Sequence, residues 1–141
     1  MIGELKTVGF VYKDIFSILK KLEDFFDLSK LKIEEVTFNK NILNEDIEPV
    51  KLKIASAFFT TITLEFISII EGKNIFEDFL SKSEGGLHHV GFNVNNLNES
   101  IEKLKSQGLK MIFNGSNTNI KMVIFDTQMI FGHDTKIIEE L

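Results

Sequence analysis

The sequence predicts an α+β fold: two βαβββ modules that pair their sheets into a shared open trough with the helices outside. Three observations support this class. Residues 7–15 align with residues 89–97, which indicates an internal repeat. Each half carries one amphipathic helical segment among several apolar, strand-like segments. A module with one helix and four strands leaves one sheet face uncovered, so two modules side by side bury it and enclose a ligand site.

The first module, about residues 1–72, begins with a strand at 6–12 that is rich in Val and Phe. A helix over 13–26 follows, with apolar residues at helical spacing. These residues are Ile15, Ile18, Leu19, Leu22 and Phe26. We then expect a strand at 31–38, a polar loop at 39–49 that holds the single Pro, and a hairpin of strands 50–59 and 62–69.

A connector over 73–85 contains a short amphipathic helix near 75–80 and leads to the second module, about residues 86–141. This module repeats the order with a strand at 87–94 and a helix at 97–106. Asn95 or Asn96 is expected to cap that helix, and Gly108 to end it. Strands at 110–113, 121–125 and 136–141 complete a single domain of residues 1–141.

Composition excludes several classes of function. Cysteine is absent, so the chain has no disulfide, thiol nucleophile or thiolate metal site. A net charge of −5 without a basic stripe argues against nucleic acid as a partner. No apolar segment has the length of a membrane span, and no signal peptide is evident. We therefore expect a cytoplasmic protein. All basic residues are Lys, so no Arg is available to clamp a phosphate.

Three residues at matched places form a candidate site. His89 lies in the first strand of the second module, while Glu65 and Glu139 lie in the last strands of the two modules. A carboxylate in an apolar strand is costly unless it is paired, hydrogen-bonded or bound to a metal. Imidazole and carboxylates together suit divalent transition metals. Thr7 occupies the place of His89 in the first module and is expected to face the trough.

The chain resembles the vicinal oxygen chelate superfamily, which includes glyoxalase I, methylmalonyl-CoA epimerase, extradiol dioxygenases and bleomycin-resistance proteins. The resemblance covers nearly the whole chain and favours the glyoxalase I- or epimerase-like branch. It rests on residues 64–72, 76–80 and 85–92, and on Phe125-Asp126-Thr127 followed by Gly132.

The resemblance implies a divalent metal (Zn, Ni, Co or Mn) held by one residue from the first and last strand of each module. Carried over by position, the ligands are Glu65, His89 and Glu139, with Thr7 in place of the usual His. An ungapped match instead puts Lys136 at the last position. We prefer Glu139 because Thr135–Glu139 has the spacing of Thr61–Glu65. The resemblance also suggests a homodimer.

Two functions remain open. In the first, a lyase or isomerase binds a small carbonyl-containing substrate through the metal, and Glu139 or Glu65 acts as the general base. In the second, a metal-free protein of the same fold sequesters a drug or antibiotic in the trough. The many Phe, the acidic balance and the replacement of His by Thr7 favour the second, while the lyase or isomerase is the function that we prefer from the sequence. Ring-cleaving oxygenase chemistry is disfavoured, since its two-His iron site lacks one His here.

Overall fold

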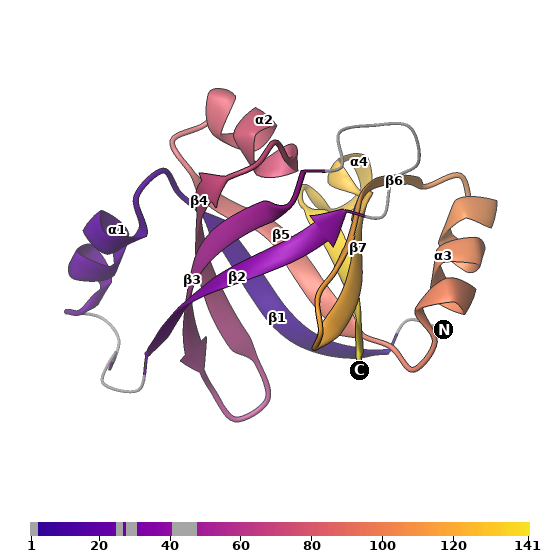
Figure 1. Ribbon diagram of the computed structural model, residues 1–141, viewed down its shortest axis with the longest axis horizontal. Coiled ribbons are helices and arrows are strands. Elements are labelled where there is room, and N and C mark those ends of the chain that lie inside the picture. The colour runs from indigo at the N-terminus through magenta and orange to yellow at the C-terminus, as the bar shows by residue number, and fades with distance from the viewer. Residues whose placement is uncertain (1–2, 25–26, 28–30, 41–47) are drawn as a thin grey trace.

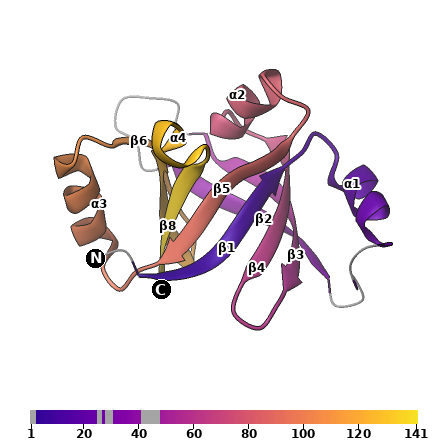
Figure 2. The same ribbon diagram turned by 180° about the vertical axis from the view of Figure 1, so that it is seen from behind.

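The computed structural model of the protein describes residues 3–24, 27, 31–40 and 48–141. Within these residues, eight strands form a closed barrel and four helices lie outside it (Figure 1). The strand order around the barrel is β1-β4-β3-β2-β6-β7-β8-β5. Helices α1 and α3 lie at opposite ends of the molecule, while α2 and α4 lie along one edge of it (Figures 1 and 2).

The first half of the chain contributes four strands and two helices. They are β1 (Glu4–Val11), α1 (Ile15–Leu22), β2 (Lys32–Lys40), β3 (Val50–Phe58), β4 (Thr63–Glu71) and α2 (Ile75–Ser81). The second half contributes the rest. They are β5 (Gly86–Asn93), α3 (Leu97–Ser106), β6 (Lys110–Ser116), β7 (Ile120–Asp126), α4 (Gln128–Phe131) and β8 (Asp134–Glu140).

The α+β class is confirmed, but the sheet is closed and not an open trough. β1 and β5 pair antiparallel along most of their length, and β2 pairs with β6 at Asn39–Ser116 and Lys40–Gly115. Figure 2 shows β1 and β5 side by side. Closure follows from edge pairing, because each half otherwise presents unpaired backbone N–H and C=O groups at both of its edges.

Inward and outward side chains alternate along the strands and build separate apolar clusters. One cluster fills part of the barrel interior and includes Phe38, Leu52 and Ile124. A second packs α3 against β7 and β8 through Leu97, Leu104 and other side chains. A third packs α1 against β3 and β4. The interior cluster leaves room for a cavity, described below.

The helices begin at side-chain caps. Asn96 caps α3, and its side-chain oxygen accepts a hydrogen bond from the Glu99 N–H at 3.1 Å. Asp14 and Asn74 cap α1 and α2 in the same manner. Gly108 follows α3 with a positive φ of 86°, as its predicted role as a helix stop requires.

Three expectations for elements need comment. Helix α4 was not predicted, because four residues are too few to show a helical period. Helix α1 ends at Leu22, and Phe26 lies outside the described residues, as do residues 41–47 of the predicted loop. Strand β8 begins at Asp134, two residues before the predicted start. Among the helices that the structure describes, none has the length and apolar character needed to cross a membrane.

Candidate functional site

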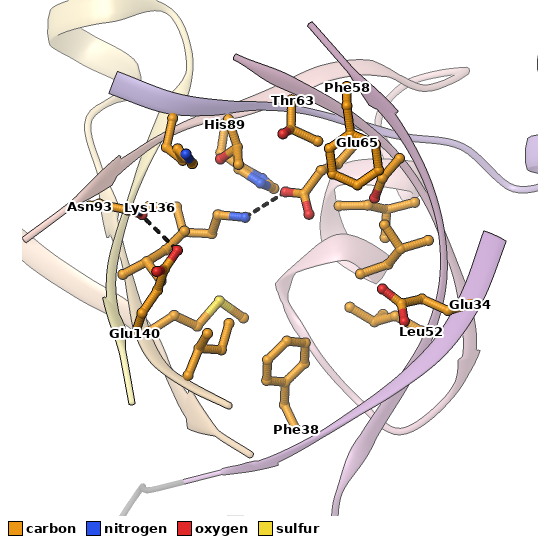
Figure 3. Close-up of a pocket in the computed structure, with 18 of the residues that line it drawn as sticks. Glu34, Phe38, Leu52, Phe58, Thr63, Glu65, His89, Asn93, Lys136 and Glu140 are labelled. Atoms are coloured by element: carbon orange, nitrogen blue, oxygen red, sulfur yellow. Dashed lines mark hydrogen bonds and ion pairs between the residues drawn. The ribbon is translucent and has the colours of Figure 1, made fainter. Parts of the chain in front are cut away.

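The barrel encloses a cavity of about 290 Å³. Its polar lining includes Thr7, Glu65, His89 and Lys136. Aromatic side chains cover other parts of the wall, among them Phe38, Phe58 and Phe76. Figure 3 shows His89, Glu65 and Lys136 pointing toward one another in the cavity. The polar groups thus converge within a largely apolar chamber.

The strand register explains why these four residues meet. β1 and β5 pair antiparallel so that Thr7 lies opposite Gly91 and His89 lies opposite Gly9. On the outer sides of this pair, Gly9 lies opposite Glu65 in β4, and Gly91 lies opposite Lys136 in β8. The two halves therefore place equivalent residues around one point: Thr7 matches His89, and Glu65 matches Lys136.

Glycine at positions 9 and 91 is required by this pairing of β1 with β5. A Cβ atom on Gly9 would overlap the His89 ring at Nε2, and one on Gly91 would overlap the Thr7 hydroxyl oxygen. The Lys136 Cε atom would also lie 3.0 Å from a Cβ on Gly91. Each functional side chain thus lies over the glycine of the opposite strand.

Lys136 and Glu65 form an ion pair inside the cavity. Lys136 Nζ donates a hydrogen bond to Glu65 Oε1 at 2.7 Å, and the two side chains are only 8% and 17% exposed. Burial strengthens the attraction but removes both charges from water. The ammonium has two further N–H groups for an acceptor on a ligand.

The structure does not bring Glu139 to this cavity, contrary to our preferred match. Lys136, Ile138 and Glu140 line the cavity, so Glu139 lies on the opposite face of β8. There Glu139 Oε1 accepts a hydrogen bond from the Leu97 N–H at 3.3 Å, at the start of α3. The match of Thr135 with Thr61 aligned Glu65 with a residue three positions beyond Lys136. An odd shift along a strand moves each side chain to the opposite face of the sheet.

His89 is 1% exposed, and its pKa is lowered well below the ordinary value, first by burial and then by the Lys136 ammonium. His88 is 2% exposed, and burial, with Lys136 again adding to it, lowers its pKa to about 4. Both rings are therefore neutral at neutral pH. Their Nδ1 atoms lie 2.9 Å apart, which requires one shared proton.

Three buried polar atoms of the site have no hydrogen-bond partner among the described residues: the Thr7 hydroxyl oxygen, His89 Nε2 and Asn93 Oδ1. A buried polar atom left unpaired costs about 1–3 kcal/mol. Because all three atoms belong to cavity-lining residues, a bound ligand or water can satisfy them. The cavity is therefore a candidate binding site.

These residues do not fit the divalent metal that the family resemblance implies. In place of a third ligand the cavity has the Lys136 ammonium, a cation already bonded to Glu65. A protonated Lys has no lone pair to give to a metal, and its charge opposes one. Among the residues that the structure describes, no group of three or more His, Cys, Asp or Glu side chains is placed to hold a metal ion.

Part of the site was not predicted from the sequence. Asp134 was not singled out, yet its Oδ2 atom lies 3.5 Å from His88 Nε2. Burial, and then Asp126, raise the pKa of Asp134. An ungapped repeat would have found Lys136. His133, in the loop before β8, stacks on Phe131 and does not line the cavity.

Comparisons with known proteins agree with this architecture. The model of the glyoxalase/bleomycin resistance protein/dioxygenase superfamily matches residues 7–123. No curated protein matches the sequence significantly.

Three solved structures illustrate the likeness in fold. Methylmalonyl-CoA epimerase from Mycobacterium tuberculosis is 14% identical, with a TM-score of 0.67 over 99% of this chain and 89% of that one. A hypothetical protein from Bacillus halodurans C-125 is 18% identical, with a TM-score of 0.68 over 98% and 94%. The Streptomyces coelicolor epimerase in complex with 2-nitronate-propionyl-CoA is 12% identical, with a TM-score of 0.67 over 99% and 98%. The family match over most of the chain and the shared fold lead to one conclusion: the protein belongs to the glyoxalase/bleomycin resistance protein/dioxygenase superfamily.

Proposed function

We propose that the protein is an isomerase or lyase that acts on a small carbonyl-containing substrate in the barrel cavity. The observation that carries the proposal is the buried pair of Lys136 ammonium and Glu65 carboxylate, 2.7 Å apart, beside the unpartnered atoms of Thr7 and His89. An electrophile and a base in one apolar chamber are the two groups that enolisation of a carbonyl compound requires.

In this proposal Lys136 takes the electrophilic role that a metal has elsewhere. One of its free N–H groups donates to the carbonyl oxygen of the substrate and stabilises the negative charge that grows there. The Glu65 carboxylate accepts the proton from the α-carbon, whose C–H electrons form the carbon–carbon double bond of the enolate. Return of the proton from Glu65 to a different face or carbon completes an isomerisation.

The size and charge of the cavity narrow the substrate class. Pockets for drug-sized ligands occupy about 300–1,000 Å³, so about 290 Å³ suits a small acid, aldehyde or ketone. The sequence has no Arg to bind the phosphates of a CoA carrier, which argues against a CoA thioester. The proposal therefore departs from the substrate of the epimerases that share the fold.

A non-catalytic binding protein is the second candidate. It is favoured by the fact that Lys136 and Glu65 satisfy each other and that apolar and aromatic side chains form much of the wall. In that case the pair recognises a polar group on a drug or antibiotic and moves no proton. A cytoplasmic location, a homodimer and the division into modules 1–72 and 86–141 also stay predictions.

The experiment that separates these functions is proton exchange in D₂O. A panel of small enolisable acids, aldehydes and ketones is incubated with the protein, and NMR follows loss of the α-proton. Exchange that disappears in Glu65→Gln and persists in Glu139→Gln supports the isomerase. Thermal stabilisation by a compound without exchange supports the binding protein. Exchange that survives Glu65→Gln, or that is lost in Glu139→Gln, contradicts the proposed role of Glu65.

A further inference from the structure

His88 is an extra residue in β5, and this places two histidine rings in contact. Opposite β1, His89 faces Gly9 and Leu87 faces Phe10, so His88 forms a β-bulge between them. A bulge re-aims a side chain. Here the His88 ring packs under α2, edge-on to Phe76 and Phe79, with ring centroids 4.9 and 5.0 Å away. His89 instead lines the cavity.

The two rings continue into a third side chain. Asp134 lies opposite His89 in the register of β5 with β8. Its Oδ2 atom faces His88 Nε2 at 3.5 Å, and its Oδ1 atom accepts a hydrogen bond from Gln128 Nε2 at 3.4 Å. His88 and Asp134 both line a hollow of about 500 Å³ that is separate from the barrel cavity. The series Asp134–His88–His89 thus runs through the barrel wall.

The order of donors along this series follows from the available lone pairs. A carboxylate only accepts, so the Asp134 charge 3.5 Å from His88 Nε2 favours the tautomer of His88 with its proton on Nε2. A neutral His88 then has a lone pair on Nδ1, and the short contact between the two Nδ1 atoms requires the proton to come from His89. His89 Nε2 is left without a proton, in the cavity, where it has no partner among the described residues.

We propose that Asp134 and His88 are positioning residues that hold His89 in the tautomer with its proton on Nδ1, so that Nε2 is a hydrogen-bond acceptor in the cavity. The ligand must then present an O–H or N–H group to His89, while an acceptor oxygen meets Lys136. A small hydroxy-carbonyl or hydroxy-acid compound has both groups. This choice of ligand rests on the proposed function, but the tautomer does not.

The tautomer is measured on the ligand-free protein labelled with ¹⁵N-histidine. In the wild type, NMR is expected to show a protonated Nδ1 and a pyridine-type Nε2 at His89, with a protonated Nε2 at His88. A scalar coupling between the two Nδ1 nuclei would detect the hydrogen bond directly. In Asp134→Asn the preference at His89, about tenfold for one net hydrogen bond, is expected to fall toward equal populations, since an amide both donates and accepts.

Two further variants complete the test. His88→Asn is expected to weaken the preference at His89 as Asp134→Asn does, because the Asn amide can donate or accept at His89 Nδ1 and removes the ring nitrogen that faces Asp134. His133→Asn, the matched control outside the series, is expected to leave the His89 signals unchanged. A protonated Nε2 at His89 in the wild type, or an unchanged preference in folded Asp134→Asn, overturns the proposal. Because no substrate is used, neither result depends on whether the protein is an isomerase.

Discussion

Lys136 and Glu65 are each largely removed from water and depend on one another. Removing one partner leaves the other charge buried and unpaired. Lys136→Met is therefore expected to lower the free energy of unfolding by about 3 kcal/mol, measured by urea denaturation. The double variant Lys136→Met/Glu65→Leu is the control and should recover most of this loss. Equal losses in the single and double variants would show that the pair is not coupled.

The residue at position 136 also determines whether the site can bind a metal. Thr7→His together with Lys136→Glu would give the cavity two imidazoles and two carboxylates at the four matched positions. We expect this double variant to bind one Zn²⁺ or Co²⁺ per chain in calorimetric titration, with ligand types that suit these ions. The wild type and Thr7→His, which retain Lys136, are expected not to bind. Comparable binding by the wild type would refute the account of Lys136.

At the scale of elements, α3 offers a matched pair of asparagines. Asn96 accepts a hydrogen bond from the Glu99 N–H, whereas Asn95 is exposed and makes no such cap. Asn96→Ala is expected to destabilise the protein by about 1 kcal/mol in thermal or urea unfolding, and Asn95→Ala by much less. A larger effect at Asn95 would contradict the observed cap.

Element positions were largely predictable from the sequence, and strand phase was not. Apolar periodicity located each of the eight strands to within a few residues, and the repeat brought Thr7 and His89 together correctly. Which residues of β8 face the cavity depends on where β8 begins after β7 ends at residue 126. Four residues between these strands form α4, and no periodic pattern in the sequence marks this helix. Hence Glu139 was preferred where the structure has Lys136.

The contact of His88 with Asp134 could not be predicted from the sequence either. It depends on a β-bulge, which shifts the register between Gly9 and Phe10 but leaves the apolar pattern of β5 unchanged. Alternation along a strand places neighbouring side chains such as His88 and His89 on different faces. Nothing in the sequence indicates that their Nδ1 atoms meet, because alternation predicts rings that point apart.

At the scale of the whole molecule, the buried histidines make stability depend on pH. The unfolded chain protonates His88 below about 6.5, whereas the folded protein does so only near its pKa of about 4. Since the unfolded state binds more protons in this window, stability is lost as pH falls from 6.5. His89, whose pKa is also lowered, acts in the same direction, and Asp134, whose pKa is raised, opposes it.

We therefore expect the free energy of unfolding to fall by about 1.6 kcal/mol for each of these histidines between pH 6.5 and 5, with a slope that steepens toward about 1.4 kcal/mol per pH unit. Urea denaturation at several pH values checks this, in a range above the ordinary pKa of most carboxyl groups. The slope should be smaller in His88→Asn. A flat profile in the wild type would show that the folded protein binds as many protons at these rings as the unfolded chain does.

The pairing of β1 with β5 has a consequence for how the chain unfolds. Thr7 and Glu65 precede the connector that contains α2, and His89 and Lys136 follow it. Each half of the polypeptide thus contributes two of the four polar side chains of the cavity, and neither half forms the site alone. A ligand that contacts Lys136 and Glu65 binds both halves of the chain and holds them together. Its binding free energy then opposes their separation and makes the two halves melt as one cooperative unit.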